Sequence, residues 1–329
     1  MTFTNRRTTL LALAFGMLGL APGIAAAEYP EKPITLLVPF AAGGPSDKIA
    51  RDLAEAMSKP LGQTIVVENA TGAGGTIGTA RLARSNADGY TLLVHHIGLA
   101  TAPALYKNPG YKSSDLAFVG LINEAPSTLI GKPTLAANTL AELRKTIAES
   151  GSKLNLANAG VGSASHLCEL LLQSALKSDM TLVPYRGTGP AMTDLMGGQV
   201  DLMCEQATNS VPQITAKSVK VYGVSSSKRM ELPAMASVPT LAEGGLAGFD
   251  FTVWHGLYAP HGTPKPVLDK INAALRTALK NPEFIKRQES VGITVVTDDR
   301  LSPAGHQKFF EAELAKWGRV IKDAGIAPE

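Results

Sequence analysis

The amino-acid sequence predicts an α/β protein built from two lobes, each with a mainly parallel sheet. Short apolar runs typical of strands alternate with helical patterns, glycine-rich loops follow several of these strands, and the alternating series occurs twice along the chain. Alternation of strand and helix is typical of parallel sheets covered by helices. Open sheets of this kind bind ligands at the carboxyl ends of their strands, so the loops that follow the strands are the first place to look for a site.

The first series begins near residue 34. Strand-like runs such as Ile34 to Val38 carry consecutive apolar side chains, as expected for strands buried on both faces. We predict strands at 34–38, 63–68 and 90–94 and helices at 47–59 and 76–84.

The second series begins near residue 127. We predict strands at 128–130, 154–157, 181–183, 200–203 and 219–224 and helices at 139–149, 166–176 and 191–196. Towards the C-terminus, apolar residues recur at three- and four-residue spacing in 267–279 and 309–321, which indicates two helices that pack on a lobe. We therefore assign residues 28–126 and 252–329 to one lobe and residues 127–251 to the other.

Residues 1–27 have the pattern of a secretory signal peptide. Arg6 and Arg7 precede an apolar run from Leu10 to Leu20, and Ala25 to Ala27 provide small residues for cleavage. The alternative, a membrane anchor, needs roughly 20 apolar residues, and Pro22-Gly23 ends the run before that length. We expect cleavage after Ala27 and export to the periplasm.

The net charge of the chain gives no support for binding to nucleic acid or to a membrane surface. Without residues 1–27 the chain has 29 basic and 28 acidic side chains, a formal charge of +1 in place of +3. Such a balance does not favour binding to nucleic acid or to a membrane surface. With 45% apolar and 18% charged residues, the composition is that of a globular protein.

Three glycine-rich loops carry the candidate chemistry. They are residues 40–47, 160–166 and 185–190, each between a predicted strand and a helix. Free backbone N–H groups at a helix start attract anions, and Ser163 and Ser165 add hydroxyls there, although either is also an ordinary N-cap. Asp47 does not fit a purely anionic pocket and can instead complement the helix dipole. Together the loops predict a carboxylate held between two lobes.

Other chemistries have weaker support. Residues 72–78 fail the dinucleotide fingerprint because Ile77 stands where the third glycine is needed, and no histidine spacing matches a metal site. We therefore expect no cofactor, no metal and no catalytic residue. An exported hydrolase is the main alternative, since Ser150-x-x-Lys153 and Ser225-x-x-Lys228 match a short motif, but its companion motifs are missing.

Cys168 and Cys204 are the only cysteines. Export would allow a disulfide between them, whereas two small buried thiols are an equally simple interpretation. The sequence does not decide between these alternatives.

Blocks of residues along the whole exported chain resemble the substrate-binding proteins of tripartite tricarboxylate transporters, also called the Bug family. The matching blocks are Val38-Pro39-Phe40, Gly43-Gly44, Asp47 with Arg51, residues 67–69, 72–75 and 88–93, residues 162–166, Pro184 to Gly187, residues 198–203, 237–240 and 259–264. The chain departs from the family pattern at Ala41-Ala42, where a proline is common, at Glu205, where an aspartate is common, and at His95-His96, where small polar residues are usual.

This resemblance implies a Venus-flytrap fold of the periplasmic-binding-protein type, with a small-molecule carboxylate bound between the lobes. A di- or tricarboxylate fits such a site, and so does an aromatic acid such as terephthalate. It also implies delivery to membrane transporter subunits, and we expect the protein to act as a monomer. A ligand-sensing subunit for a membrane kinase would use the same pocket. One of His95 and His96 either faces the cleft or lies at a strand end. The predicted ligand contacts are Phe40, Ala41, Ala42, Gly43, Gly44, Asp47, His95, His96, Ser163, Ala164, Ser165, Tyr185, Gly187, Thr188 and Glu205.

Overall fold

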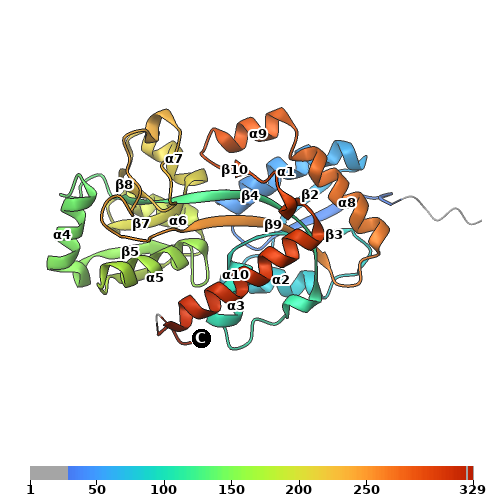
Figure 1. The fold of residues 1–329 in the computed structure, drawn as a ribbon, viewed down its shortest axis with the longest axis horizontal. Helices are drawn as coiled ribbons and strands as arrows, with labels where there is room; N and C mark the ends of the chain where they lie inside the picture. The colour runs from blue at the N-terminus through green and yellow to red at the C-terminus, as the bar shows by residue number, and fades with distance from the viewer. Residues whose placement is uncertain (1–28, 324, 329) are drawn as a thin grey trace, which may run out of the picture.

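The computed structural model describes residues 29–323 and 325–328 (Figure 1). The predicted signal peptide lies outside these residues. Ten strands form one continuous curled sheet, in the order β2-β1-β3-β9-β4-β7-β5-β6, with β8 and β10 each paired to β4. Two lobes lie at the two ends of this sheet, and the long strands β4 and β9 run between them (Figure 1).

The first lobe is built on the parallel strands β2-β1-β3. Four of the five residues of β1 are buried, because helices cover both faces of the sheet. Helix α1 has Pro45 in its first turn and ends at Gly62, which adopts a left-handed conformation that suits glycine. The elements are β1 (Ile34–Val38), α1 (Pro45–Leu61), β2 (Ile65–Asn69), α2 (Thr76–Ala83), β3 (Thr91–His96) and α3 (Gly98–Leu105).

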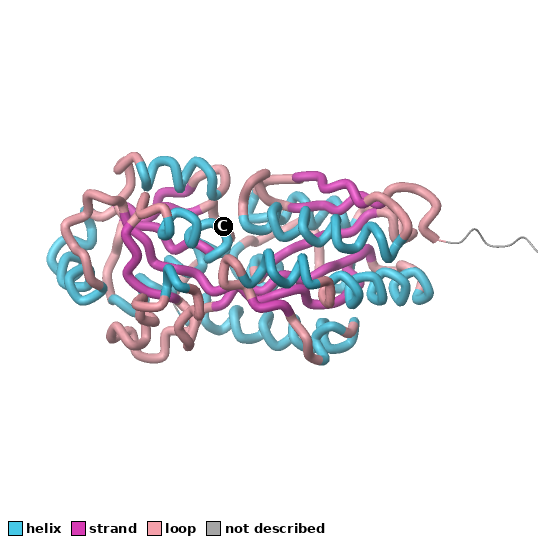
Figure 2. Tube along the Cα trace, turned by 90° about the horizontal axis from the view of Figure 1, so that it is seen from above, coloured by secondary structure: helices cyan, strands magenta, loops and turns pink. Residues whose placement is uncertain are grey.

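The second lobe repeats this pattern on the parallel strands β6-β5-β7. Glycine-rich loops again connect strands to helices, and each helix begins near the carboxyl end of the preceding strand. The elements are α4 (Leu140–Ser150), β5 (Asn155–Asn158), α5 (Ala164–Leu176), β6 (Thr181–Pro184), α6 (Thr188–Met196), β7 (Leu202–Gln206), α7 (Ala207–Thr215) and β8 (Lys220–Val224). Figure 2 shows the two lobes from above, with strands running between them.

Two long strands, β4 (Leu116–Gly131) and β9 (Thr252–Pro260), connect the lobes. They form an antiparallel ladder up to the pair Pro126 and Thr252, and β4 then pairs with β7 and β8 from Ser127 onward. The change of partner falls at the predicted lobe boundaries of 126/127 and 251/252. Those boundaries remain our proposal for the division of the chain.

A single buried serine joins the two connecting segments next to this ladder. The Oγ of Ser225 accepts a hydrogen bond from the Ser127 N–H at 2.8 Å and donates one to the Phe251 carbonyl at 2.6 Å. Backbone bonds run alongside, from Ser225 N to Ser127 O and from Phe251 N to Ser225 O, each 2.8 Å. We call Ser127, Ser225 and Phe251 the crossover clamp.

The predicted α/β fold with two lobes is confirmed, but the sheets are mixed rather than mainly parallel. Among the ladders of the described strands, parallel pairing is confined to β2-β1-β3 and β6-β5-β7, and every ladder of β4 and β9 is antiparallel. We predicted only 128–130 of β4 as strand and no strand at β9. The chain crosses between the lobes in both directions, so the two crossing strands run antiparallel.

The C-terminal helices pack against α1 and α3 of the first lobe. The apolar stripe of α8 is buried at Ile271, Ala274 and Leu275, and that of α10 is buried at Phe310 and Trp317. Helix α10 also extends toward α5 of the second lobe (Figure 1). The elements are α8 (Lys265–Ala278), α9 (Pro282–Glu289), β10 (Thr294–Val295) and α10 (Pro303–Asp323), and single 3₁₀ turns lie at Ala73–Gly75, Ser113–Asp115, Gly151–Lys153, Pro233–Met235 and Asp299–Leu301.

Within the described residues, no helix combines the length and the apolar character that crossing a bilayer requires.

Candidate functional site

A small cavity of about 30 Å³ lies between the lobes. At this volume it accommodates a group of a few heavy atoms, such as one carboxylate or a water cluster. The first lobe lines it with Phe40, Ala41, Gly44, Pro45, Ser46 and His96, and the second lobe lines it with Ala159, Ser163, Ala164, Ser165, Gly187, Thr188, Glu205 and Gln206. The structure therefore brings together ten of the fifteen predicted contacts.

Five predicted contacts do not line this cavity: Ala42, Gly43, Asp47, His95 and Tyr185. Ala42 and Gly43 are exposed. The Tyr185 hydroxyl turns away to donate to Asp194 at 2.7 Å. Four lining residues were not among the predicted contacts, namely Pro45, Ser46, Ala159 and Gln206, although all of them lie in or beside the strand-end loops.

Asp47 shapes the first loop. Its carboxylate accepts hydrogen bonds from Gly43 N–H at 2.9 Å, Asn69 Nδ2 at 2.9 Å and Arg51 at 3.0 Å. Burial alone would raise the pKa of Asp47, but these hydrogen bonds outweigh it and the pKa is lowered. The carboxylate is thus ionised and already fully engaged, which leaves the α1 start to present backbone N–H groups to the cavity.

The start of α5 presents two hydroxyls. Ser163 is the N-cap and its Oγ accepts from the His166 N–H at 3.2 Å, while Ser165 Oγ accepts from the Ala159 N–H at 2.9 Å. The two hydroxyl oxygens lie 3.0 Å apart. One hydroxyl proton is used between them, so the other remains available to donate into the cavity. Capping and ligand recognition are compatible here.

The start of α6 comes very close to the first lobe. Gly187 has φ +110°, and a Cβ added there would lie 2.9 Å from the Ala41 Cβ. Only glycine suits both the backbone angle and this approach. Two further contacts join the lobes: Tyr106 Oη donates to the Val161 carbonyl at 2.9 Å, and Lys48 Nζ donates to Asn209 Oδ1 at 2.5 Å.

Glu205, on β7, supplies a buried carboxyl group to the cavity. Burial raises the pKa of Glu205 to about 8, against smaller lowering effects from hydrogen bonds and from Lys48. Its side chain contacts the Thr188 hydroxyl at 3.4 and 3.5 Å. At neutral pH the group is therefore a neutral acid that can donate a hydrogen bond to an anion. Beside it, the Oε1 of Gln206 is buried without a hydrogen-bond partner among the described residues.

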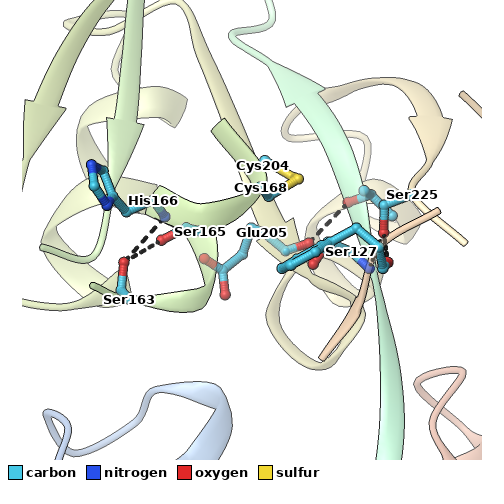
Figure 3. The surroundings of a disulfide bond; sticks show 10 residues. Ser127, Ser163, Ser165, His166, Cys168, Cys204, Glu205 and Ser225 are labelled. Atoms are coloured by element: carbon cyan, nitrogen blue, oxygen red, sulfur yellow. Dashed lines mark hydrogen bonds between the residues drawn. A yellow bond between two sulfur atoms is a disulfide. The ribbon is translucent and has the colours of Figure 1, made fainter. Parts of the chain in front are cut away.

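Cys168 and Cys204 form a disulfide, with their Cα atoms 6.0 Å apart, so the structure favours the first of the two sequence-based alternatives. The bond joins α5 to β7 (Figure 3). It therefore ties the helix that carries Ser163 and Ser165 to the strand that carries Glu205. Figure 3 shows these three side chains near the disulfide, and all three line the cavity.

Of the two adjacent histidines, His96 lines the cavity and His95 lies behind it. The His96 ring stacks on Phe40 with centroids 4.3 Å apart, and its Nδ1 accepts from the Gly98 N–H at 2.8 Å. Burial lowers the pKa of His96 well below its ordinary value. The ring is therefore neutral with its proton on Nε2, a donor that adds no charge.

A third buried histidine, His255 on β9, was not predicted. Its Nε2 lies 3.2 Å from Ser46 Oγ and its Nδ1 lies 2.9 Å from Asn123 Oδ1. Serine, histidine and asparagine in this order are the arrangement of a nucleophile, a base and an orienting group. However, burial lowers the pKa of His255 to about 3, far from the value near 7 that suits a general base. No cluster of three metal-binding side chains occurs in the described part of the chain.

Four helices begin at or next to the cavity. The first residues of α1, α5 and α6 line it, and α7 begins directly after Gln206. Each helix N-terminus carries unsatisfied N–H groups and a partial positive charge. A cavity between two α/β lobes, joined by two crossing strands and built to receive an anion, defines a two-lobed solute-binding protein.

Comparison with known proteins gives the family. The model of the tripartite tricarboxylate transporter family receptor matches residues 49–326, and the chain belongs to this family. This membership also supports the prediction that the chain binds its target rather than converting it, because the homologues are solute-binding proteins.

Three solved structures illustrate the relationship. The periplasmic binding protein BugD is 46% identical, with a TM-score of 0.88 over 92% of this chain and 100% of that chain. MatC from Rhodopseudomonas palustris, solved with bound malate, is 38% identical, with a TM-score of 0.84 over 89% of this chain and 100% of that chain. Rpa4515 from R. palustris, solved with adipate, is 30% identical, with a TM-score of 0.86 over 92% and 100%.

Proposed function

We propose that this protein captures a small organic di- or tricarboxylate in the periplasm and delivers it to the membrane subunits of a tripartite tricarboxylate transporter. The observation that carries the proposal is the convergence of helix N-termini from both lobes on one cavity that contains no ionised carboxylate at neutral pH. In keeping with the sequence prediction, we further propose export by a cleaved signal peptide at residues 1–27 and action as a monomer.

The available donors suffice for useful affinity. A micromolar ligand requires about 8 kcal/mol, and hydrogen bonds to charged groups contribute roughly 1.5–3 kcal/mol each. The Ser163–Ser165 pair, the Glu205 acid and the His96 Nε2–H supply donors in addition to the backbone. Four or five of them acting together reach the micromolar range.

The size of the cavity limits what it holds as it stands. About 30 Å³ accommodates one carboxylate, so the rest of a dicarboxylate requires the lobes to separate slightly from this arrangement. The related MatC and Rpa4515 structures contain malate and adipate, which are compounds of this class. They support a carboxylate ligand here without identifying it.

A thermal-shift screen tests the proposal. Protein purified from the periplasm should be stabilised by at least one member of a panel of di- and tricarboxylates, because a ligand that binds only the folded state at 100 times its Kd adds about 2.7 kcal/mol. For a protein of this size that is a rise of several degrees in Tm. Sugars, divalent metals and cationic peptides serve as controls. Stabilisation by one of these, with none from any carboxylate, would overturn the proposed function.

A further inference from the structure

A continuous line of hydrogen bonds connects the surface of the first lobe to the cavity. Its links are Asp52 Oδ2 to Gln288 Nε2 at 3.1 Å, Gln288 Oε1 to Asn123 Nδ2 at 2.8 Å, Asn123 Oδ1 to His255 Nδ1 at 2.9 Å, and His255 Nε2 to Ser46 Oγ at 3.2 Å. Of these residues, Ser46, Asn123, His255 and Gln288 are buried. We call this line the Asp52–Ser46 relay.

The direction of every bond in the relay follows from its outer end. Asp52 pairs with Arg287 at 3.2 Å, so its carboxylate is an acceptor only. The amide of Gln288 must therefore turn its NH₂ toward Asp52 and its oxygen toward Asn123. Asn123 must then give its NH₂ to Gln288, which leaves its oxygen facing His255.

The same reasoning fixes the inner end. His255 must donate from Nδ1 to the Asn123 oxygen, and because the buried ring is neutral its Nε2 carries no proton. Ser46 therefore donates its hydroxyl proton to His255. A serine has one proton and two lone pairs. The hydroxyl of Ser46, which lines the cavity, is left with lone pairs alone to offer a ligand.

We propose that Ser46 is a specificity-determining residue that accepts a hydrogen bond from a hydroxyl or ammonium group next to the carboxylate of the bound ligand, with the Asp52–Ser46 relay holding it in this polarity. The inference rests on the proposed function. The Ser46 hydroxyl would then accept a hydrogen bond from the ligand, whereas the Ser163–Ser165 pair keeps one proton to donate to it. A ligand without such a donor leaves the lone pairs of Ser46 unpaired, which lowers affinity by about tenfold to a hundredfold.

Isothermal calorimetry with matched ligands tests the preference. Succinate, malate and aspartate share one skeleton and differ only in a hydrogen, hydroxyl or ammonium at carbon 2, and glutarate, 2-hydroxyglutarate and glutamate form a second set. For the wild type we expect the hydroxy or amino member to bind at least tenfold more tightly than the unsubstituted one. Whichever of the two is preferred identifies the donor. Equal affinities within both sets would overturn the proposal.

Three variants locate the preference. In Ser46→Ala, the ratio of the affinity for the hydroxy or amino ligand to that for the unsubstituted ligand should be close to one. Gln288→Met should reduce it as well, since it frees the Asn123 amide to turn and to reverse the His255 proton. Ser174→Ala, which removes an exposed serine hydroxyl from α5, should keep the wild-type ratio. A wild-type ratio in Ser46→Ala would contradict the assignment.

A second measurement does not depend on the ligand or on the folding of a variant. The ¹⁵N chemical shifts of the wild-type histidines distinguish protonated from unprotonated ring nitrogens. We expect His255 to have a protonated Nδ1 and an unprotonated Nε2, and the opposite pattern would overturn the relay. If no carboxylate binds at all, the proposed function fails, whereas a carboxylate that binds without any preference for a donor group contradicts only the role of Ser46.

Discussion

The two sides of the cavity present groups of different polarity. The second lobe offers donors: the shared Ser163–Ser165 hydroxyls, the free start of α5 and the protonated Glu205. The first lobe also has donors, the backbone N–H groups at the start of α1 and the His96 Nε2–H. It differs in adding an aromatic surface from Phe40 and His96, and a Ser46 hydroxyl whose proton is already used. The difference suggests that the second lobe supplies most of the attraction for an anion, and that the first lobe distinguishes between anions.

The largest expected effect concerns how the second lobe is held together. Replacing both Cys168 and Cys204 with alanine removes a link between positions 36 residues apart, which the chain-entropy model values at about 4 kcal/mol. We expect the free energy of unfolding, measured in urea, to fall by about 2–4 kcal/mol. Hydrogen exchange should quicken in α5 and β7 and remain slow in α1, which belongs to the other lobe. An unchanged urea midpoint would show that the disulfide does not stabilise the donor side.

The next effect concerns the donors themselves. Ser163→Ala with Ser165→Ala removes the hydroxyl pair, and the loss of a hydrogen bond to a charged ligand costs roughly 1.5–3 kcal/mol. We expect carboxylate affinity, measured by calorimetry, to fall about 10- to 100-fold, with a loss of about 1 kcal/mol in stability from the N-cap. Ser174→Ala on the same helix is the control, because that serine is exposed. An affinity equal to that of the wild type would show that the carboxylate binds elsewhere.

The smallest expected effect on affinity concerns pH. The folded protein holds a proton on Glu205 up to about pH 8, whereas the unfolded chain releases it near the ordinary value of 4.5. The free energy of unfolding should therefore fall as the pH rises from about 4.5 to about 8. Affinity for an anion should fall above about pH 8, by at most tenfold per pH unit, because the ionised Glu205 repels the ligand.

Glu205→Gln keeps a neutral side chain at every pH, so its affinity should be nearly constant between pH 7 and 9. Calorimetry across this range compares the two proteins. The same decline in both would assign the pH dependence to another group.

Much of the fold was predictable because its signals are local. Buried strand runs, glycine loops and helical periodicity all lie within a few residues, and the strand-end loops they define contain most of the cavity lining. β9 and the first part of β4 were not predicted, although both are mostly apolar. They fall outside the alternation of strand, glycine loop and helix, and each is paired with a strand far away in the sequence.

The hydrogen-bond partners of the buried polar groups could not be predicted from the sequence either. Ser46 and His255 are separated by 209 positions, and no local pattern connects them. Which of His95 and His96 faces the cavity depends on how β3 sits beside β9. The disulfide likewise needed the distance between α5 and β7, which the spacing of two cysteines does not give.

The crossover clamp determines how the lobes can move. Ser225 holds Ser127 and Phe251 through one hydroxyl that both accepts and donates, and the ladder of β4 and β9 continues from there. One strand cannot slide along the other without breaking these bonds together. We therefore expect the two strands to bend together and to resist sliding past each other. On this expectation, separation of the lobes at the cavity would occur as a rotation about this pair of strands rather than as a sliding movement.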